Sequence, residues 1–475
     1  MIKIAYRIPG WLVPTPVLLT FLAVPYLHLV LLGMGEKMAL VLAVGIAAIL
    51  AGGLVAGRRR IYGWLDRTVR IVERIDPRQW LYLVLGLGLI LRICWAGIYK
   101  ASLQSDFAIY FDLARGLVER RAYGGDGAYL AYWPPGLPLF LAPLIAVFGP
   151  ETWIPLLGNL LITALAIVLT ARLADGLRSV LVARMAPLLV AIWPANIMSA
   201  GLASKEQLLI PLLIGVVLSF LRCRERGSSG YLLLTGVLSG MAALTQPSFI
   251  LIPVLLVLGE ILATGRVRAP LRHSLFVMLG LALVVSPWVW RNYRLLGDLV
   301  MISTNGGDVL YRANNPRATG TYTVRGEVEL QGLDELERNR RGSELAREWI
   351  RRNPRQFLRL AFRKLIAYHG DDNMGAYETL RRGLGIGGTR LIISKILSTG
   401  YWLLIWMLIL LGWLRNPSAY HRLALSIPLL FFICQMAIDS VYESGSRHHV
   451  PFSGLLAMAA ALAFERRPLH LDPDR

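Results

Sequence analysis

The amino-acid sequence predicts an all-α polytopic membrane protein with about 12 transmembrane helices. Of its 475 residues, 55% are hydrophobic and only 17% are charged, and the mean hydropathy is +0.54. An average soluble domain is less apolar and carries more charge than this. Apolar runs long enough to cross a bilayer also recur along the chain, and this recurrence predicts many spans.

The expected spans are runs of about 20 mainly apolar residues, the length of helix that crosses the hydrocarbon core of a bilayer. The break at Gln246-Pro247-Ser248 fits either a tight helical hairpin or one broken helix. The first run contains Pro14 and Pro16 and lacks a small-residue cleavage pattern, so we expect no cleavable signal peptide. The spans lie near residues 15–33, 38–56, 79–98, 152–175, 184–200, 206–222, 231–246, 249–264, 273–292, 396–414, 422–439 and 448–464.

The charge balance and the cysteines exclude several other classes of protein. Lys and Arg total 50 and Asp and Glu total 30, which gives a net charge of +20. In a soluble protein this excess suggests nucleic acid, but here most arginines lie between apolar runs and act as topology signals, so no nucleic-acid partner is expected. Cys94, Cys223 and Cys434 lie in or at the end of apolar stretches, without the spacing of a disulfide framework or a zinc site.

Arginines in the short loops predict the orientation, because positive residues near span ends are retained in the cytoplasm. We therefore expect a multi-pass protein of the inner (plasma) membrane with both termini in the cytoplasm. The arginines that share this side are Arg58, Arg59, Arg60, Arg67, Arg70, Arg74, Arg78, Arg172, Arg178, Arg184, Arg222, Arg224, Arg226, Arg266, Arg268, Arg272, Arg415, Arg422, Arg466 and Arg467.

The spans divide the chain into five parts. These are three N-terminal spans with an arginine-rich loop, a first outer segment, a central bundle, a second outer segment, and three C-terminal spans with a tail. An even number of spans separates the outer segments, so both face the periplasm. The second is expected to be a small mixed segment, and loops longer than about 60 residues translocate despite their arginines. The bounds are 1–98, 99–151, 152–292, 293–395 and 396–475.

Each outer segment is expected to carry a helix at the membrane surface. Gly136 to Phe148 is apolar but only about 13 residues long, too short to span, which predicts an interfacial or re-entrant helix. From Trp349 to Ile366, apolar residues recur at helical spacing among arginines. This pattern predicts one basic amphipathic helix on the membrane surface.

Asp106 is the candidate catalytic residue. It follows Ser105 just after a span on the expected outer face and shares one helical side with Tyr110 and Leu113, whereas Asp112 lies on another side. An acidic residue at the mouth of a membrane bundle suits a general base toward a hydroxyl, because partial burial raises its basicity. The alternative is that Asp106 caps the helix that follows Ser105.

Two further charged stretches stand at expected outer ends of spans. Lys205 and Glu206 either mark the membrane boundary or belong to a site. Arg291, beside Asn292, either holds a phosphate through bidentate hydrogen bonds or snorkels to the surface.

The remaining candidates are Arg92 and the stretch around Arg447. Arg447 precedes His448 and His449, and adjacent histidines lack the i, i+4 spacing of a helical metal pair, so phosphate binding by Arg447 is favoured over a metal site. Arg92 lies inside a span and needs a partner such as Asp106 or a bound anion.

The order of these features resembles the GT-C class of lipid-dependent glycosyltransferases. The similarity is greatest to family-39-like bacterial proteins related to protein O-mannosyltransferases and to the lipid A aminoarabinose transferase. It covers most of the chain from about residue 79 onward. The residues that carry it are Arg92, Asp106 with Tyr110 and Ala114, Trp133-Pro134-Pro135-Gly136, Ser204 and Glu206, Gly240 to Pro247, Pro287-Trp288 with Arg291-Asn292, and Arg447 with Pro451.

The resemblance implies a GT-C-like fold and an inverting transfer of a sugar from a polyprenyl-phosphate-linked donor to a glycan, lipid or protein acceptor at the periplasmic face. It implies Asp106 as the catalytic base. The chain departs from some relatives, because Trp133 replaces a basic residue before the Pro-Pro pair, and Asp106 lacks the adjacent acid that would help hold a divalent metal. No metal site or cofactor is therefore assigned. The expected substrate-binding residues are Arg92, Tyr110, Asp112, Lys205, Glu206, Arg291, Asn292, Arg447 and His448.

Two other functions remain open at this point. A transporter or flippase for a lipid-linked oligosaccharide would also place arginines near a lipid phosphate, although such proteins often show internal repeats, and none is visible here. An O-antigen polymerase or ligase is also multispanning, with arginines in its outer loops. The early acidic loop before the Pro-Pro element favours transfer from a carrier of a single sugar.

Overall fold

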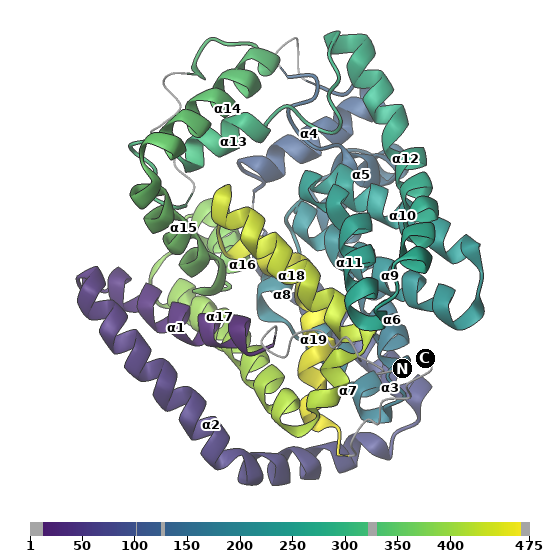
Figure 1. Cartoon of the computed structure of the whole chain (residues 1–475), viewed down its shortest axis with the longest axis vertical. Helices are drawn as coiled ribbons and strands as arrows, with labels where there is room; N and C mark the ends of the chain where they lie inside the picture. The colour runs from purple at the N-terminus through teal and green to yellow at the C-terminus, as the bar shows by residue number, and fades with distance from the viewer. Residues whose placement is uncertain (1–12, 101, 125–128, 322–329, 467–475) are drawn as a thin grey trace.

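The computed structural model describes residues 13–100, 102–124, 129–321 and 330–466, and every regular element in this part of the chain is a helix (Figure 1). The α-helices are α1 Pro14–Leu31, α2 Glu36–Glu73, α3 Pro77–Ile98, α4 Asp106–Glu119, α5 Gly136–Phe148, α6 Ile154–Asp175, α7 Val180–Ala191, α8 Pro194–Met198, α9 Lys205–Arg226, α10 Ser229–Thr245, α11 Ile252–Thr264, α12 Arg268–Leu296, α13 Gly306–Ala313, α14 Glu335–Arg352, α15 Pro354–His369, α16 Met374–Ala376, α17 Gly388–Arg415, α18 Leu423–Val441 and α19 Ser453–Ala461. Short 3₁₀ helices are η2 Pro247–Leu251, η6 Pro417–His421, η7 Ser446–Phe452 and η8 Leu462–Phe464, and η5 Tyr377–Arg382 is a π-helix.

The all-α polytopic architecture is confirmed, with ten helices in the described residues that are long and apolar enough to cross a membrane. Two of the twelve expected spans differ. The run at 231–246 forms α10, an apolar helix of 17 residues. The run at 448–464 is divided among η7, α19 and η8, because Pro451 lacks the N–H that a continuous α-helix would use.

The break at Gln246 is a helical hairpin. α10 ends at Thr245, and η2 leads into α11, whose last turns bring Glu260 into an ion pair with Arg224 near the end of α9. α10 starts close to that end of α9, and α11 returns to it. α10 and α11 therefore run in opposite directions. α10 also packs closely on α12, where a Cβ atom on Gly236 would lie 2.8 Å from the Cα atom of Gly280.

Loops that the arginine pattern assigns to one side of the membrane are in contact with one another. Arg415 binds Asp66 at 3.0 Å, Arg184 donates to the carbonyl of Val72, and Arg466 pairs with Glu73. The two long outer segments lie at the opposite end of the bundle (Figure 1). These contacts gather the arginine-bearing loops at one end of the bundle, and the side of the membrane that each end faces stays a prediction.

The two outer segments pack against each other through buried hydrogen bonds. The Glu335 carboxylate accepts from the backbone N–H groups of Leu130 and Ala131 at 3.0 and 3.1 Å and from the Thr304 hydroxyl at 3.0 Å. The described part of segment 293–395 is helical rather than mixed. Because Glu335 starts α14, this helix fixes the loop that leads into the Pro134-Pro135 element.

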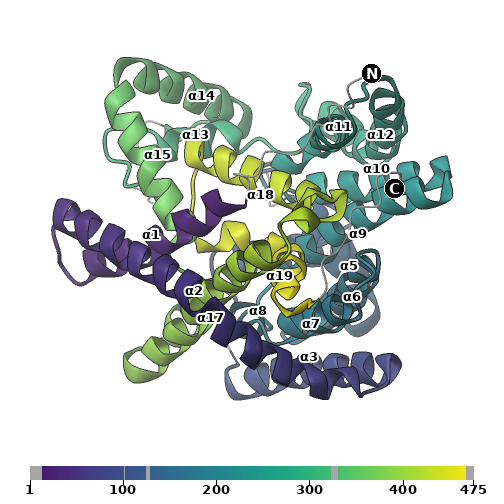
Figure 2. The ribbon, with the colours of Figure 1, turned by 60° about the horizontal axis from the view of Figure 1, so that its bottom comes forward.

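The expected basic amphipathic helix is two helices. α14 and α15 meet at Asn353, whose φ of −129° and ψ of 53° are not helical. Pro354 causes the break, because its ring disfavours the α conformation of the preceding residue. α15 then lies beside α1 (Figure 2). Ile366 packs against residues of α1 and α2, and the Tyr26 and Phe362 rings meet edge to face.

The short apolar helix that was expected at the membrane surface has the expected bounds. α5 runs Gly136–Phe148, and a Cβ atom on Gly136 would lie 2.7 Å from the backbone of Thr245 at the end of α10. Only glycine allows this approach. The Pro-Pro-Gly element is therefore seated on the central bundle, close to the start of η2.

Candidate active site

Asp106 and Arg447 form the centre of the site. Asp106 is the first residue of α4, and its Oδ2 accepts a hydrogen bond of 2.8 Å from Nη1 of Arg447 in η7. The Nε atom of Arg447 lies 3.8 Å from Oε1 of Glu206, the second residue of α9. One guanidinium group thus connects carboxylates from two separate helices.

The backbone before Asp106 is strained. Ser105 has φ 53° and ψ −134°, in a region that residues other than glycine rarely adopt, and no side-chain hydrogen bond caps α4 there. Such a conformation costs about 1 to 3 kcal/mol and tends to occur at functional sites. The carboxylate of Asp106 points to Arg447, so capping does not explain this aspartate.

Charge and burial act against each other at the pair. Burial favours the neutral form of Asp106, but the charge and hydrogen bond of Arg447, with further help from Lys205, hold the pKa of Asp106 below its ordinary value. Burial also opposes the charge on Arg447, yet Asp106 and Glu206 raise its pKa well above normal. Both groups are therefore ionised at neutral pH.

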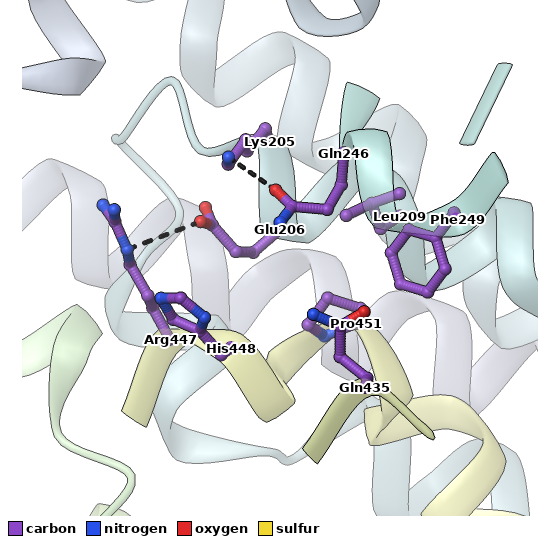
Figure 3. Close-up of a pocket in the computed structure, with 9 residues that line it drawn as sticks. All are labelled: Lys205, Glu206, Leu209, Gln246, Phe249, Gln435, Arg447, His448 and Pro451. Atoms are coloured by element: carbon purple, nitrogen blue, oxygen red, sulfur yellow. Dashed lines mark hydrogen bonds and ion pairs between the residues drawn. The ribbon is translucent and has the colours of Figure 1, made fainter. Parts of the chain in front are cut away.

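A small pocket lies beside Arg447 (Figure 3). The Lys205 Nζ donates to Gln246 Oε1 at 2.6 Å, and the Glu206 carboxylate accepts from Ser204 at 2.7 Å. Cationic and polar groups form one part of the pocket and apolar groups the other, which suits a ligand with an anionic head and an apolar tail. Its lining consists of Lys205, Glu206, Leu209, Gln246, Phe249, Gln435, Arg447, His448 and Pro451.

His448 and His449 point to different partners. The Nδ1 atom of His448 lies 3.1 Å from Asp439 Oδ1 at the pocket. His449 is buried, with Nδ1 2.7 Å from the carbonyl of Tyr368, Nε2 3.1 Å from Asp372, and its ring stacked on Trp402. His449 thus anchors η7 to the core while Arg447 and His448 face the pocket. Among the residues that the structure describes, no group of three or more His, Cys, Asp or Glu side chains is placed to hold a metal ion.

Tyr110 lies one turn after Asp106 in α4, whereas Asp112 lies outside the site. Tyr110 is buried against Trp133, with ring centroids 5.7 Å apart, and burial raises the pKa of its hydroxyl well above the ordinary value, so it stays neutral. Asp112 is exposed and pairs with Arg115 at 3.2 Å on the outer side of α4. The structure therefore does not bring Asp112 into the site.

Arg92 has backbone partners rather than the expected Asp106 or anion. Its buried guanidinium donates to the carbonyls of Gly88 at 2.9 Å and Ala191 at 3.0 Å. Ala191 is the last residue of α7, where carbonyls lack a helical partner. Arg92 therefore supports the break between α7 and α8.

Arg291 and Asn292 also hold backbone. Arg291 donates to the carbonyls of Tyr123 and Leu130, each at 2.7 Å, and lies over the Trp288 ring. Asn292 is buried and donates to the carbonyl of Val300. Arg291 and Arg447 thus have different partners, so the expectation that Arg291 holds the substrate phosphate is not supported by its contacts.

Several polar residues at the site did not emerge from the sequence as candidates. Gln435 donates to Asp439 and accepts from Ser248, and the i, i+4 spacing of this polar pair inside an apolar run was a usable signal. In the sequence, Gln246 indicated only the position of a helix break. Glu378 lies in η5, where burial raises the pKa of its carboxyl; Asp106 also raises this pKa and Arg447 lowers it. No pattern in the surrounding sequence indicates that Glu378 lies near the site.

Residues 133–290 match the model of the dolichyl-phosphate-mannose-protein mannosyltransferase family. The fold is similar to that of the Archaeoglobus fulgidus oligosaccharyltransferase in its apo form, with a TM-score of 0.51 at 13% identity, over 82% of this chain and 50% of that one. The archaeal enzyme in complex with an inhibitory peptide and a dolichol-phosphate matches with a TM-score of 0.49 at 12% identity, over 81% and 50%. ArnT from Cupriavidus metallidurans bound to undecaprenyl phosphate matches with a TM-score of 0.43 at 13% identity, over 81% and 77%.

At 13% identity, the match to the apo archaeal structure with its TM-score of 0.51 shows a similar fold and no more than that. This chain aligns with about half the length of the archaeal oligosaccharyltransferase. None of the curated proteins compared with the chain matches it significantly.

Proposed function

We propose that this chain is a GT-C-type membrane glycosyltransferase that transfers a sugar from a polyprenyl-phosphate-linked donor to an acceptor hydroxyl, with inversion at the anomeric carbon. The match of residues 133–290 to the dolichyl-phosphate-mannose-protein mannosyltransferase family supports this proposal. The observation that carries the proposal is Arg447, held between the carboxylates of Asp106 and Glu206 at the edge of the pocket. The arrangement puts a base next to a cation that can receive a leaving phosphate. The acceptor is a lipid, a glycan or a protein.

The pocket supports a lipid phosphate as the donor's leaving group. Lys205 has three N–H donors, of which Gln246 uses one, and Arg447 offers a planar group suited to two phosphate oxygens. Leu209 and Phe249 line the apolar part, where the first isoprene units of the carrier would lie. Of the three cations considered for the phosphate, Lys205 and Arg447 are kept in this proposal and Arg291, which binds backbone carbonyls, is not.

In the proposed reaction, the acceptor oxygen attacks the anomeric carbon as Asp106 takes the hydroxyl proton. The bond between that carbon and the phosphate oxygen breaks, and the electron pair leaves with the polyprenyl phosphate. Arg447 and Lys205 stabilise the charge that develops on the phosphate. As Arg447 shifts its interaction toward the phosphate, its hold on Asp106 weakens, so the pKa of Asp106 rises when the carboxylate must accept a proton.

The experiment that tests this proposal detects both the carrier and the reaction. Native mass spectrometry of the purified protein should show bound polyprenyl phosphate, and incubation with polyprenyl-phosphate-linked sugars and a candidate acceptor should release free polyprenyl phosphate in equal amount to product. A flippase would instead move the intact lipid-linked sugar across a vesicle membrane and release none. A polymerase or ligase would require a carrier with a longer glycan.

We further propose that the site faces the periplasm, as the arginine distribution predicts. A single cysteine at Glu344, an exposed position of α14 in the second outer segment, should react with an impermeant reagent added outside intact spheroplasts. A single cysteine at Gly63, in α2 beside Tyr62 and its bond to the Leu411 carbonyl, should react only after the membrane is opened. The reverse pattern would overturn the orientation.

A further inference from the structure

We propose that the corner between α14 and α15 binds the phosphate headgroups of anionic lipids in the leaflet on its side of the membrane. We call this surface, made of Arg351, Arg352 and Arg355, the basic corner. It is separate from Asp106 and its pocket, and the proposal does not depend on the reaction catalysed there.

The charge of this region is concentrated at the corner. The segment from Arg338 to Lys364, with both ends included, contains ten Lys or Arg residues and two Glu residues. At the far end of α14, Arg338 and Arg340 are balanced by Asp308 and Asp298. Arg351 and Arg355 are exposed, and no carboxylate of the described residues lies within ion-pair distance of either one. Arg352 pairs with Glu348 at 2.6 Å, so the positive charge that the described residues leave unbalanced at the corner is that of Arg351 and Arg355.

The position of the corner relative to the bilayer follows from the contacts of α15. Arg359 and Arg363 bind the carboxylate of Glu36, the first residue of α2. After Lys37, α2 becomes apolar and several of its side chains face outward, with Met38 59% and Val41 68% exposed. On a membrane-spanning helix such side chains contact lipid tails, so Glu36 marks the edge of the hydrocarbon region.

The basic corner lies about one helical turn beyond the residues of α15 that bind Glu36. Arg355, Arg359 and Arg363 are spaced by four residues and therefore share one face of α15. Two of them are occupied by Glu36, and Arg355 stands one turn farther along the same face. Figures 1 and 2 both show α15 beside the end of the α1–α2 hairpin. Arg355 is therefore placed at the level of lipid headgroups.

The side chains of the basic corner and its surroundings suit the binding of a phosphate that is attached to an acyl lipid. Guanidinium groups bind phosphate through paired hydrogen bonds. Leu358, between Arg355 and Arg359, is 66% exposed, and the hairpin residues Leu31 and Leu32 are 71% and 84% exposed. An arginine-rich surface beside outward-facing leucines is the pattern of a helix in the interface of an anionic membrane.

The test compares lipid retention in two double variants of the full-length protein. The protein is placed in nanodiscs of phosphatidylcholine containing phosphatidylglycerol, released, and weighed with its bound lipids by native mass spectrometry. Wild-type protein should retain phosphatidylglycerol in preference to phosphatidylcholine. Arg351→Gln with Arg355→Gln should lower this preference by about fivefold for each arginine removed.

Arg340→Gln with Arg341→Gln is the matched control, because it removes the same charge from exposed positions at the other end of α14. It should retain the wild-type preference, and Arg351→Lys with Arg355→Lys should retain most of it. Equal losses in the corner and control variants would show a general effect of net charge and overturn the site. A wild-type protein without preference for phosphatidylglycerol would overturn it as well.

Discussion

Replacing Asp106 by Asn is expected to slow sugar transfer by about 100- to 10,000-fold, the usual loss when a general base is removed. The amide has nearly the same shape as the carboxyl and its oxygen can still accept a hydrogen bond from Arg447, so the fold and donor binding should persist. Arg447 also keeps Glu206 as a counter-charge. The measurement is the initial rate of polyprenyl phosphate release at saturating donor.

Asp112→Asn provides the matched control on the same helix. Asp112 has an exposed side chain and pairs only with Arg115 on the outer side of α4, so its loss should leave the rate nearly unchanged. Near-wild-type turnover by the Asp106 variant, or greater sensitivity at Asp112, would refute the assignment of the base.

Replacing Arg447 by Gln should lower the rate by about 100- to 1,000-fold, because a charge that stabilises the leaving phosphate is lost. The variant should also change its pH dependence. Without Arg447, burial becomes the dominant influence and raises the pKa of Asp106, whereas the wild-type pair holds that pKa below its ordinary value. A larger share of Asp106 is then protonated at mildly acidic pH, so the acid limb of the pH–rate profile should move to higher pH.

Arg291→Gln separates this effect from a general loss of structure. Arg291 holds the carbonyls of Tyr123 and Leu130, so its replacement should lower the temperature of thermal unfolding without moving the acid limb. The two profiles are compared at matched temperatures below unfolding. An unshifted profile for the Arg447 variant, or an equal shift for the Arg291 variant, would contradict the proposed role of Arg447.

The sequence by itself determined the all-α membrane architecture and ten of the twelve expected spans, because the bilayer imposes a local rule on length and polarity. Each spanning helix must supply about 20 apolar residues and satisfy its own backbone hydrogen bonds, so it is visible in a short window of sequence. Prolines also act locally: Pro247 lies at the break that the sequence predicted, whereas Pro354 divides what was expected to be one helix. Pro451 divides the last expected span, a break that the apolar run alone does not reveal. Asp106 and Arg447 could be identified as candidates from their positions at expected span ends, supported by the family resemblance.

Only the tertiary structure decided what each buried cation does. Arg92, Arg291 and Arg447 look alike in the sequence, since each is a lone charge in or beside an apolar run. A guanidinium group must find acceptors when it leaves water, and those acceptors can come from anywhere in the chain. For Arg92 and Arg291 they are backbone carbonyls that loops and helix ends leave open, whereas for Arg447 the acceptor is the carboxylate of Asp106, 341 residues away. Such long-range pairings depend on how the helices pack, and no local pattern of residues records them.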